Sequence, residues 1–207
     1  MANLTPLVRI VDDDPTICES QSFFLQLAGW QTVTYQDPNT FLERDDWARP
    51  GCIILDVRMP SLSGLEVQKE LNKRGVDLPV IFLSAHGDIE MAMNCVEQGA
   101  FNFLVKPPLP EKLKDLVEKA IKLNKSQRRI KKEAMELQRL FSSLTSTEQL
   151  VARQVAKGLS NKLIGEVLGM SERTVQSHRG KIFSKLDVEN AVELFQFLSD
   201  MDNSSSL

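Results

Sequence analysis

Aspartates follow the first apolar run of the chain directly. Asp12, Asp13 and Asp14 come straight after residues 7–11, and Asp56 ends another apolar run further along. Carboxylates held at one point repel each other, so a cluster of them is costly unless a cation fills it. Oxygen ligands in this number favour Mg²⁺. The spacing therefore predicts a magnesium site wherever the ends of these two runs meet.

A hydroxyl and a cation stand at equivalent places later in the chain. Ser84 ends the apolar run at residues 80–83, and Lys106 follows the run at residues 101–105. Once Mg²⁺ and Lys106 neutralise the carboxylates, one carboxylate could act as a nucleophile toward a phosphoryl group. The Ser84 hydroxyl could donate a hydrogen bond to a phosphoryl oxygen. These residues together predict phosphoryl chemistry.

Five β-α units are needed to bring these residues together. Strands are expected at residues 7–11, 31–35, 52–55, 80–83 and 101–105, and helices at 15–29, 40–45, 62–74, 89–98 and from 111 onward. Strands that are apolar on both faces suit a parallel sheet with helices on each side. The carboxyl ends of such strands share one edge, and every candidate residue lies at such an end.

The first half, from Val8 to about Lys125, resembles the receiver domain of two-component response regulators. The resemblance rests on the order of the acidic residues, the hydroxyl and the lysine, and on Gly64 in the loop after the third strand. It implies an α/β fold, a doubly wound five-stranded parallel sheet of the flavodoxin-like type with strand order 2-1-3-4-5. It also implies that the peptide bond between Lys106 and Pro107 is cis.

The same resemblance assigns roles to single residues. The implied phosphoryl site consists of Asp56 as phosphoacceptor, Ser84 and Lys106 as phosphoryl contacts and Phe103 as the switch aromatic. The implied metal site consists of Asp12, Asp13, Asp56 and the backbone carbonyl of Arg58. Asp14 precedes Pro15, so it suits a helix N-cap as well as a metal ligand. His86 matches no role in the family.

The net charge of −3 argues against a nucleic-acid-binding protein only when it is counted over all 207 residues together. Residues 1–125 hold 18 Asp and Glu against 13 Lys and Arg, whereas residues 126–207 hold 10 against 12. Between Thr145 and Leu186 the excess of basic residues reaches four. The length predicts two modules, and the charge predicts that they have different partners.

The basic module has the pattern of four helices. A capping box of Thr145 and Glu148 starts the first, and Gly169 separates the second from the third in a turn typical of helix-turn-helix. The third helix, residues 171–186, is expected to bury Val175, Ile182 and Leu186. The fourth, residues 190–201, is expected to carry its apolar stripe on Ala191, Leu194, Phe195 and Leu198.

The opposite face of the third helix is polar and suits a DNA major groove. The expected DNA contacts are Arg173, Gln176, Ser177, Gly180 and Lys181, with Lys162 of the preceding helix on phosphate. The segment from Leu144 to about Leu198 resembles the LuxR-type helix-turn-helix. Gln176 and Gly180 depart from residues common in that family, so the target sequence is expected to differ. Gly180 fits close backbone approach to DNA and neutral drift equally.

The whole chain is thereby similar to NarL/FixJ-family regulators of the FixJ-like branch. The expected domains are a receiver at 1–125, a helical linker at 126–141, an all-α four-helix DNA-binding domain at 142–201 and a polar tail at 202–207. Neither Pro nor Gly interrupts residues 111–157, where Leu116, Leu123, Ile130 and Leu137 recur as in a heptad. This stiff helix could pair with a second copy or pack on its own domains.

The resemblance implies a DNA-binding transcription factor of a phosphorelay and no enzyme. Its expected cofactor is Mg²⁺, and its expected partners are a sensor histidine kinase, double-stranded promoter DNA, RNA polymerase and, after phosphorylation, a second copy of the chain. No run approaches the roughly 20 apolar residues of a membrane span, so we expect a cytoplasmic protein. Cys18, Cys52 and Cys95 form no C-x-x-C pair and are expected as buried thiols.

Two other functions are weighed against this one. Asp12-x-Asp14-x-Thr16 matches the D-x-D-x-T of haloacid-dehalogenase-type phosphatases, whose first aspartate is the nucleophile. That family needs a further acidic pair at a later strand end, and none follows Lys106, while Asp45 and Asp46 fall in a polar loop in the wrong order. An orphan regulator that works without phosphorylation would share the fold.

Overall fold

The computed structural model of the chain describes residues 4–85 and 89–204, so His86 lies outside the described residues. The chain divides into two compact units between Gln127 and Arg128. Within the described ranges, no helix has the length and apolar character that crossing a bilayer requires.

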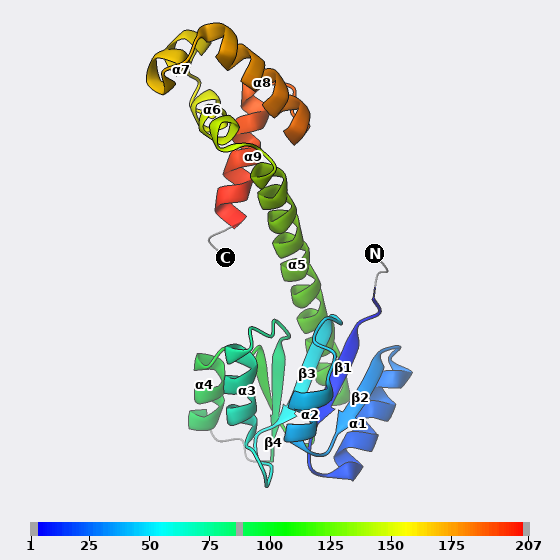
Figure 1. Cartoon of the computed structure of the whole chain (residues 1–207). Coiled ribbons are helices and arrows are strands. Elements are labelled where there is room, and N and C mark those ends of the chain that lie inside the picture. The colour runs from blue at the N-terminus through cyan, green and yellow to red at the C-terminus, as the bar shows by residue number, and fades with distance from the viewer. Residues whose placement is uncertain (1–3, 86–88, 205–207) are drawn as a thin grey trace. The chain divides into compact units, whose positions relative to one another are not determined.

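Unit 1 is a parallel sheet with helices on both faces (Figure 1). Its strands are β1 (Leu7–Val11), β2 (Gln31–Tyr35), β3 (Gly51–Asp56), β4 (Val80–Ser84) and β5 (Asn102–Val105), in the order β2-β1-β3-β4-β5. Its helices are α1 (Pro15–Leu27), α2 (Pro38–Arg44), α3 (Gly64–Lys73), α4 (Ile89–Glu97) and α5 (Pro110–Ser142), which continues past Gln127. The expected fold class and strand order are confirmed.

Two apolar layers hold the sheet. One layer joins α1 and α5 to the sheet, and the other joins α2, α3 and α4 to its opposite face. All six residues of β3 are buried, as a central strand covered on both faces requires. The free cysteines Cys18, Cys52 and Cys95 are all buried in these layers, as expected.

The helix starts follow from their capping residues. Asp14 accepts a hydrogen bond from the backbone N–H of Thr16 at 2.8 Å, so it is the N-cap of α1. Asp37 caps α2 in the same way, and Pro38 occupies the first helical position, which suits its fixed φ. For this reason α2 begins two residues before the expected start at residue 40.

A charged side chain lies in the middle of β1 and is fully buried. Arg9 is 0% exposed, and its Nε donates to Asp45 at 2.6 Å. Its Nη2 donates to the carbonyls of Asp46 and Arg49, while the Tyr35 hydroxyl donates to Asp45 at 2.9 Å. The sequence had indicated that Asp45 lies in a polar loop, whereas the structure shows it paired with the buried Arg9. Asp45 ties the segment after α2 to the sheet.

Arg9→Met should destabilise unit 1 by about 3–5 kcal/mol, because Asp45 would keep a buried charge without a partner. Adding Asp45→Asn should recover part of that loss, since the unpaired charge is then gone. Urea unfolding followed by tryptophan fluorescence measures both variants, because Trp47 packs on Phe41 with ring centroids 5.2 Å apart. Equal stability of the single and double variants would contradict the proposed pairing.

Unit 2 consists of the end of α5 and four further helices. These are α6 (Ser146–Ala156), α7 (Asn161–Leu168), α8 (Glu172–Leu186) and α9 (Ala191–Ser204). The expected buried stripe of α8 is confirmed, since Val175 and Ile182 are 0% exposed and Leu186 is 3% exposed.

The apolar stripe of α9 differs from the expected one. Leu194 and Leu198 are buried as expected, but Phe195 is 56% exposed, and Phe197 and Met201 take its place in the core. α9 packs against α6, and the apolar core of unit 2 includes Phe197 and Met201 but not Phe195. The helix also extends to residue 204, because buried Met201 holds its last turns in place beyond the expected end.

At each end of α5, the apolar residues of the heptad pack into the core of one unit. Leu116 and Ala120 lie in the core of unit 1. Phe141 lies in the core of unit 2, with Leu137 packed against it. Between them, Leu123 is 40% exposed and Ile130 is 38% exposed. Packing on its own domains therefore accounts for most of the seam, and a self-pairing surface would be short.

Glu148 is a buried acid of unit 2. It is 3% exposed, and its carboxylate accepts from the Thr145 N–H at 2.8 Å and from Lys185 Nζ at 2.7 Å. The hydrogen bond from Lys185, followed by that from Thr145, lowers the pKa of Glu148 to about 2. The sequence indicated the capping box but not the lysine, which comes from the last turn of α8.

Glu148→Gln should destabilise unit 2 by about 2 kcal/mol near pH 7, because Gln keeps the capping box but loses the charged bond to Lys185. The folded-state pKa is depressed, so this stability is present above the ordinary value of 4.5 and is lost as the pH falls toward 2. Urea unfolding followed by circular dichroism at several pH values measures the difference. Exposed Glu166→Gln on α7 is the control, and a pH-independent difference would contradict the assignment.

Candidate functional site

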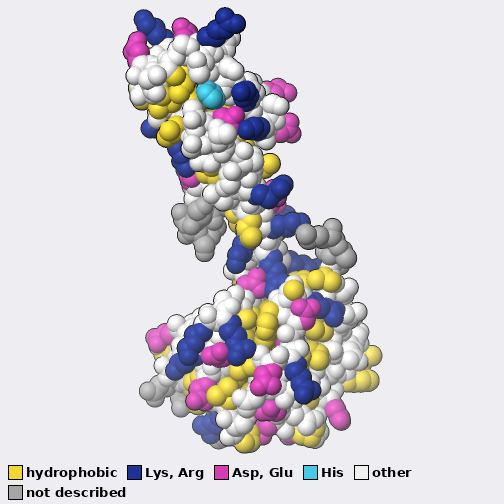
Figure 2. All heavy atoms as spheres, viewed as in Figure 1, with side chains coloured by type: hydrophobic (Ala, Val, Ile, Leu, Met, Phe, Trp, Pro, Cys, Tyr) yellow, Lys and Arg dark blue, Asp and Glu magenta, His cyan; other side chains and the backbone are white. Residues whose placement is uncertain are grey.

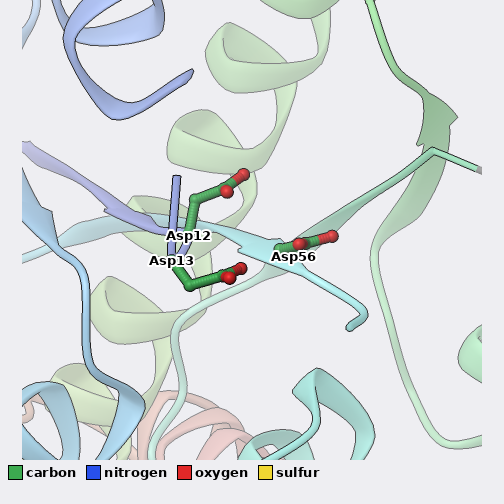
Figure 3. Close-up of side chains that lie close together, drawn as sticks. All are labelled: Asp12, Asp13 and Asp56. Carbon is green, nitrogen blue, oxygen red and sulfur yellow. The ribbon is translucent and has the colours of Figure 1, made fainter. Parts of the chain in front are cut away.

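Three carboxylates converge at the carboxyl-end edge of the sheet. Asp12 and Asp13 come from the loop after β1, and Asp56 comes from the last residue of β3 (Figure 3). One oxygen from each of the three lies within 4.8 Å of the others. Strand pairing causes this approach, because β1 and β3 are parallel neighbours with Val11 opposite Leu55.

The cluster is partly buried and contains one cation. Asp12 is 2% exposed and Asp56 is 7% exposed, whereas Asp13 faces solvent. Lys106 Nζ lies 2.6 Å from Asp12 Oδ2 and 3.2 Å from Asp56 Oδ2. The lysine therefore bridges the two buried carboxylates.

Burial and charge act against each other at this site. Burial raises the pKa of Asp12 above its ordinary value, although the hydrogen bond from Lys106 opposes the change. Burial acts to lower the pKa of Lys106, but its contacts with Asp12 and Asp56 outweigh burial and raise it. The lysine is therefore held in its charged form.

The donor set fits a divalent cation. One lysine charge faces three carboxylates, and oxygen donors are those that Mg²⁺ prefers. Asp14 is absent from the converging group because it caps α1. Arg58 lies two residues beyond Asp56, in the exposed loop after β3. Its carbonyl as a metal ligand stays a prediction.

Ser84 and Lys106 are joined through the backbone. Ser84 is 1% exposed at the end of β4, opposite Val105 of β5. The Lys106 N–H donates to the Ser84 carbonyl at 2.8 Å. The peptide bond between Lys106 and Pro107 is cis, as the resemblance implied. Phe103 lies two residues before Val105 and packs against the layer formed by α2, α3 and α4.

Gly64 has a structural role that its place in a family loop did not reveal. A Cβ at this position would lie 2.2 Å from the Asp56 carbonyl oxygen and 2.9 Å from the Phe82 ring. The Gly64 N–H donates to the Val57 carbonyl at 3.0 Å. The start of α3 thus packs directly on the backbone of the candidate phosphoacceptor, which only glycine permits.

The polar face of α8 is a second candidate site. The exposed residues on this face and on α7 include all those expected to contact DNA: Arg173, Gln176, Ser177, Gly180, Lys181 and Lys162. A Cβ added to Gly180 would meet no atom within 4 Å. The packing of unit 2 therefore does not explain why this position is a glycine.

The turn between α7 and α8 is tightly built. Ser171 caps α8 by accepting from the Thr174 N–H at 3.1 Å, and Gly169 ends α7 in the left-handed region with φ 68°. A Cβ on Gly165 would lie 2.6 Å from the Met170 carbonyl oxygen. These contacts fix the start of α8 against α7, and the sequence had indicated the turn but not the close approach at Gly165.

One further contact braces α8. Arg179 donates to Asn161 at the start of α7 at 2.8 Å, and its guanidinium lies 5.6 Å from the centroid of the Phe183 ring. His178 is half-buried, which agrees with its position near the buried edge of the helix. Arg179 is thus engaged in packing, while the exposed residues of the face stay available to a ligand.

Comparison with known proteins matches both units. Residues 8–118 match the response regulator receiver domain, and residues 142–198 match the bacterial regulatory proteins of the luxR family. The transcriptional regulatory protein TdiR of Thauera aromatica is 37% identical over 92% of this chain and 84% of its own length. FixJ of Azorhizobium caulinodans is 34% identical over 90% of this chain and 89% of its own.

A solved structure agrees over nearly the full length. The response regulator StyR is 38% identical and superposes with a TM-score of 0.88 over 94% of this chain and 98% of its own. The receiver match, the luxR-family match and the full-length relatives all point to one architecture. The chain is therefore a member of the NarL/FixJ family of response regulators, with a receiver domain and a LuxR-type helix-turn-helix domain.

Proposed function

We propose that this chain is a transcription factor that is switched by phosphorylation of Asp56. The observation that supports the proposal most is the convergence of three carboxylates and Lys106 at one sheet edge. A sensor histidine kinase is the proposed phosphodonor. The proposed functional division is a receiver at 1–125, a linker at 126–141, a DNA-binding domain at 142–201 and a tail at 202–207.

The residues that would hold Mg²⁺ are Asp12, Asp13, Asp56 and the Arg58 carbonyl. When bound, the ion would neutralise the carboxylates and polarise the phosphoryl oxygens. A carboxylate oxygen of Asp56 attacks phosphorus, and the bond between phosphorus and the donor histidine nitrogen breaks. The electron pair of that bond stays with the histidine ring.

Two side chains of the chain would stabilise the transferred group. The Lys106 ammonium already lies 3.2 Å from an Asp56 oxygen, which puts its charge within reach of a phosphoryl oxygen. The Ser84 hydroxyl, at the end of the adjacent strand, donates to another phosphoryl oxygen. Hydrogen bonds to a developing anion are strong in a buried site, so both groups favour the phosphorylated product.

Phosphorylation would then act at a distance from Asp56. Ser84, Phe103 and Lys106 would register the added charge, and the surface of α4, β5 and α5 up to about Lys119 would pair with a second copy. A dimer places two copies of α8 on adjacent half-sites and raises the effective affinity for promoter DNA. We place RNA polymerase among the partners, and the cytoplasm as the compartment where these partners meet.

The phosphatase alternative loses support from the capping geometry. In a phosphatase of the haloacid-dehalogenase type, Asp12 and Asp14 would act together. The Asp14 carboxylate instead accepts a hydrogen bond from the Thr16 N–H as a helix cap. Asp12 is buried and bridged to Asp56 by Lys106. Asp45, the other candidate acid, is committed to Arg9. These contacts favour a receiver over the phosphatase.

Asp56→Asn should abolish phosphorylation, because an amide is no nucleophile toward phosphorus. The measurement is the intact mass of the full chain after incubation with acetyl phosphate and Mg²⁺, where wild type gains one phosphoryl group. Asp14→Asn is the matched control, since asparagine caps a helix as well as aspartate does. A phosphoryl adduct on Asp56→Asn would refute the proposal. Loss of promoter binding on phosphorylation of wild type would refute the activating role.

Substitutions on unit 2 should separate base reading from phosphate binding. Gln176→Ala should change the preferred base at one position, with a loss of about 1–3 kcal/mol of discrimination. Lys162→Gln should weaken binding to all sequences alike and reduce the salt slope by about 0.9. Selection from a randomised duplex library, followed by anisotropy titrations in salt, measures both effects. An unchanged base preference for Gln176→Ala would remove it from the reading face.

A further inference from the structure

A basic run on α5 belongs to neither site described above. From Lys119 to Lys132 the chain carries seven Lys and Arg and no Asp or Glu. The acids Glu118 and Glu133 flank the run on either side. This is the densest positive charge of the helix, and no role for it follows from phosphorylation or from the recognition helix.

Five of these side chains share one side of the helix. At 3.6 residues per turn they fall within an arc of about 120°. The basic stripe, as we name them, consists of Lys122, Lys125, Arg128, Arg129 and Lys132. Leu123 and Ile130 lie on a different side, so the stripe does not cover the apolar seam. Figure 2 shows Lys and Arg side chains gathered over the middle of α5.

Four of the five residues of the stripe are exposed, Arg128 is half-buried, and the ion pairs that Lys122 and Arg129 make along the helix are weak. Lys125 and Lys132 are exposed, and the side chains of Lys122 and Arg129 are 74% and 73% exposed. Lys122 pairs with Glu118 at 2.7 Å, and Arg129 approaches Glu133 only at 3.7 Å. Exposed pairs of this kind contribute at most about 1 kcal/mol. A stronger anion could displace these carboxylates.

We propose that the basic stripe binds the phosphate backbone of DNA beside the site that α8 contacts. Arg128, Arg129 and Lys132 belong to unit 2, which also carries α8 and its exposed basic face. Lys125 and Lys132 are seven residues apart, a rise of about 10 Å along the helix, which matches roughly three phosphates of one strand. Lys and Arg on phosphate add affinity without reading sequence.

This inference rests on the proposed DNA-binding function and extends its contact surface. An anionic membrane or an acidic protein would also attract the stripe. DNA is favoured because three of the five stripe residues, Arg128, Arg129 and Lys132, lie in the unit that carries the reading helix, so that binding at α8 raises the local concentration of phosphates for them.

The test uses the full chain and a fluorescent duplex of random sequence, about 40 base pairs long, since backbone contacts need no operator. The stripe variant combines Lys125→Gln, Arg129→Gln and Lys132→Gln. Its control combines Arg44→Gln, Lys69→Gln and Lys73→Gln, three basic residues outside the run that are exposed as well. A third variant, Arg173→Gln with Lys181→Gln, removes charge from α8.

Anisotropy titrations over a range of salt give the affinity and its salt slope. The stripe variant should lose about two to three units of slope and bind about tenfold more weakly at low salt, while the control variant stays at the wild-type values. Unchanged slope and affinity of the stripe variant would overturn the inference. Unchanged duplex binding with lost binding to vesicles of phosphatidylglycerol would overturn it in favour of a membrane contact.

The α8 variant separates this inference from the proposed function. If it weakens duplex binding as well, and the two losses are independent, both contact surfaces are supported. If it binds like wild type while the stripe variant does not, the reading role of α8 is contradicted and the stripe stands on its own. Glutamine is a good helix former, so circular dichroism should show unchanged helicity in every variant.

Discussion

Repulsion between carboxylates at one edge of the sheet is the constraint around which unit 1 is organised. Asp12 and Asp56 are held close together by two neighbouring parallel strands, and both are nearly buried. Such an arrangement is unfavourable unless positive charge compensates it. Lys106 supplies part of that charge from the position directly after β5, which is an edge strand of the sheet. The site therefore needs the whole sheet in register.

Much of this arrangement could be predicted because the chemistry lies at strand ends. Alternating apolar runs and amphipathic stretches indicate five β-α units, and the topology of a parallel sheet then brings their ends to one edge. Helix periodicity likewise indicated which side of α8 is buried, because α8 is packed on one side only. In both cases a local pattern sufficed, since the partner of each residue was fixed by the fold class.

The features that escaped prediction depend on partners distant in sequence. An arginine within β1 looks like an exposed strand residue until Asp45, from the segment after α2, is seen to pair with it. Lys185 reaches Glu148 from another helix. Periodicity alone also cannot decide which of two adjacent apolar stripes of α9 enters the core of unit 2, so Phe195 was placed in a core that Phe197 occupies. Tertiary packing makes these choices.

Lys106 connects the charge of the site to the strands that hold it. Its ammonium contacts Asp12 and Asp56, while its backbone N–H binds the Ser84 carbonyl at the end of β4. A phosphoryl group on Asp56 would add negative charge beside the ammonium and draw it away from Asp12. Because Lys106 directly follows β5, that pull would act on the strand that carries Phe103. The same lysine that makes the carboxylate cluster tolerable is thus suited to report a change in its charge.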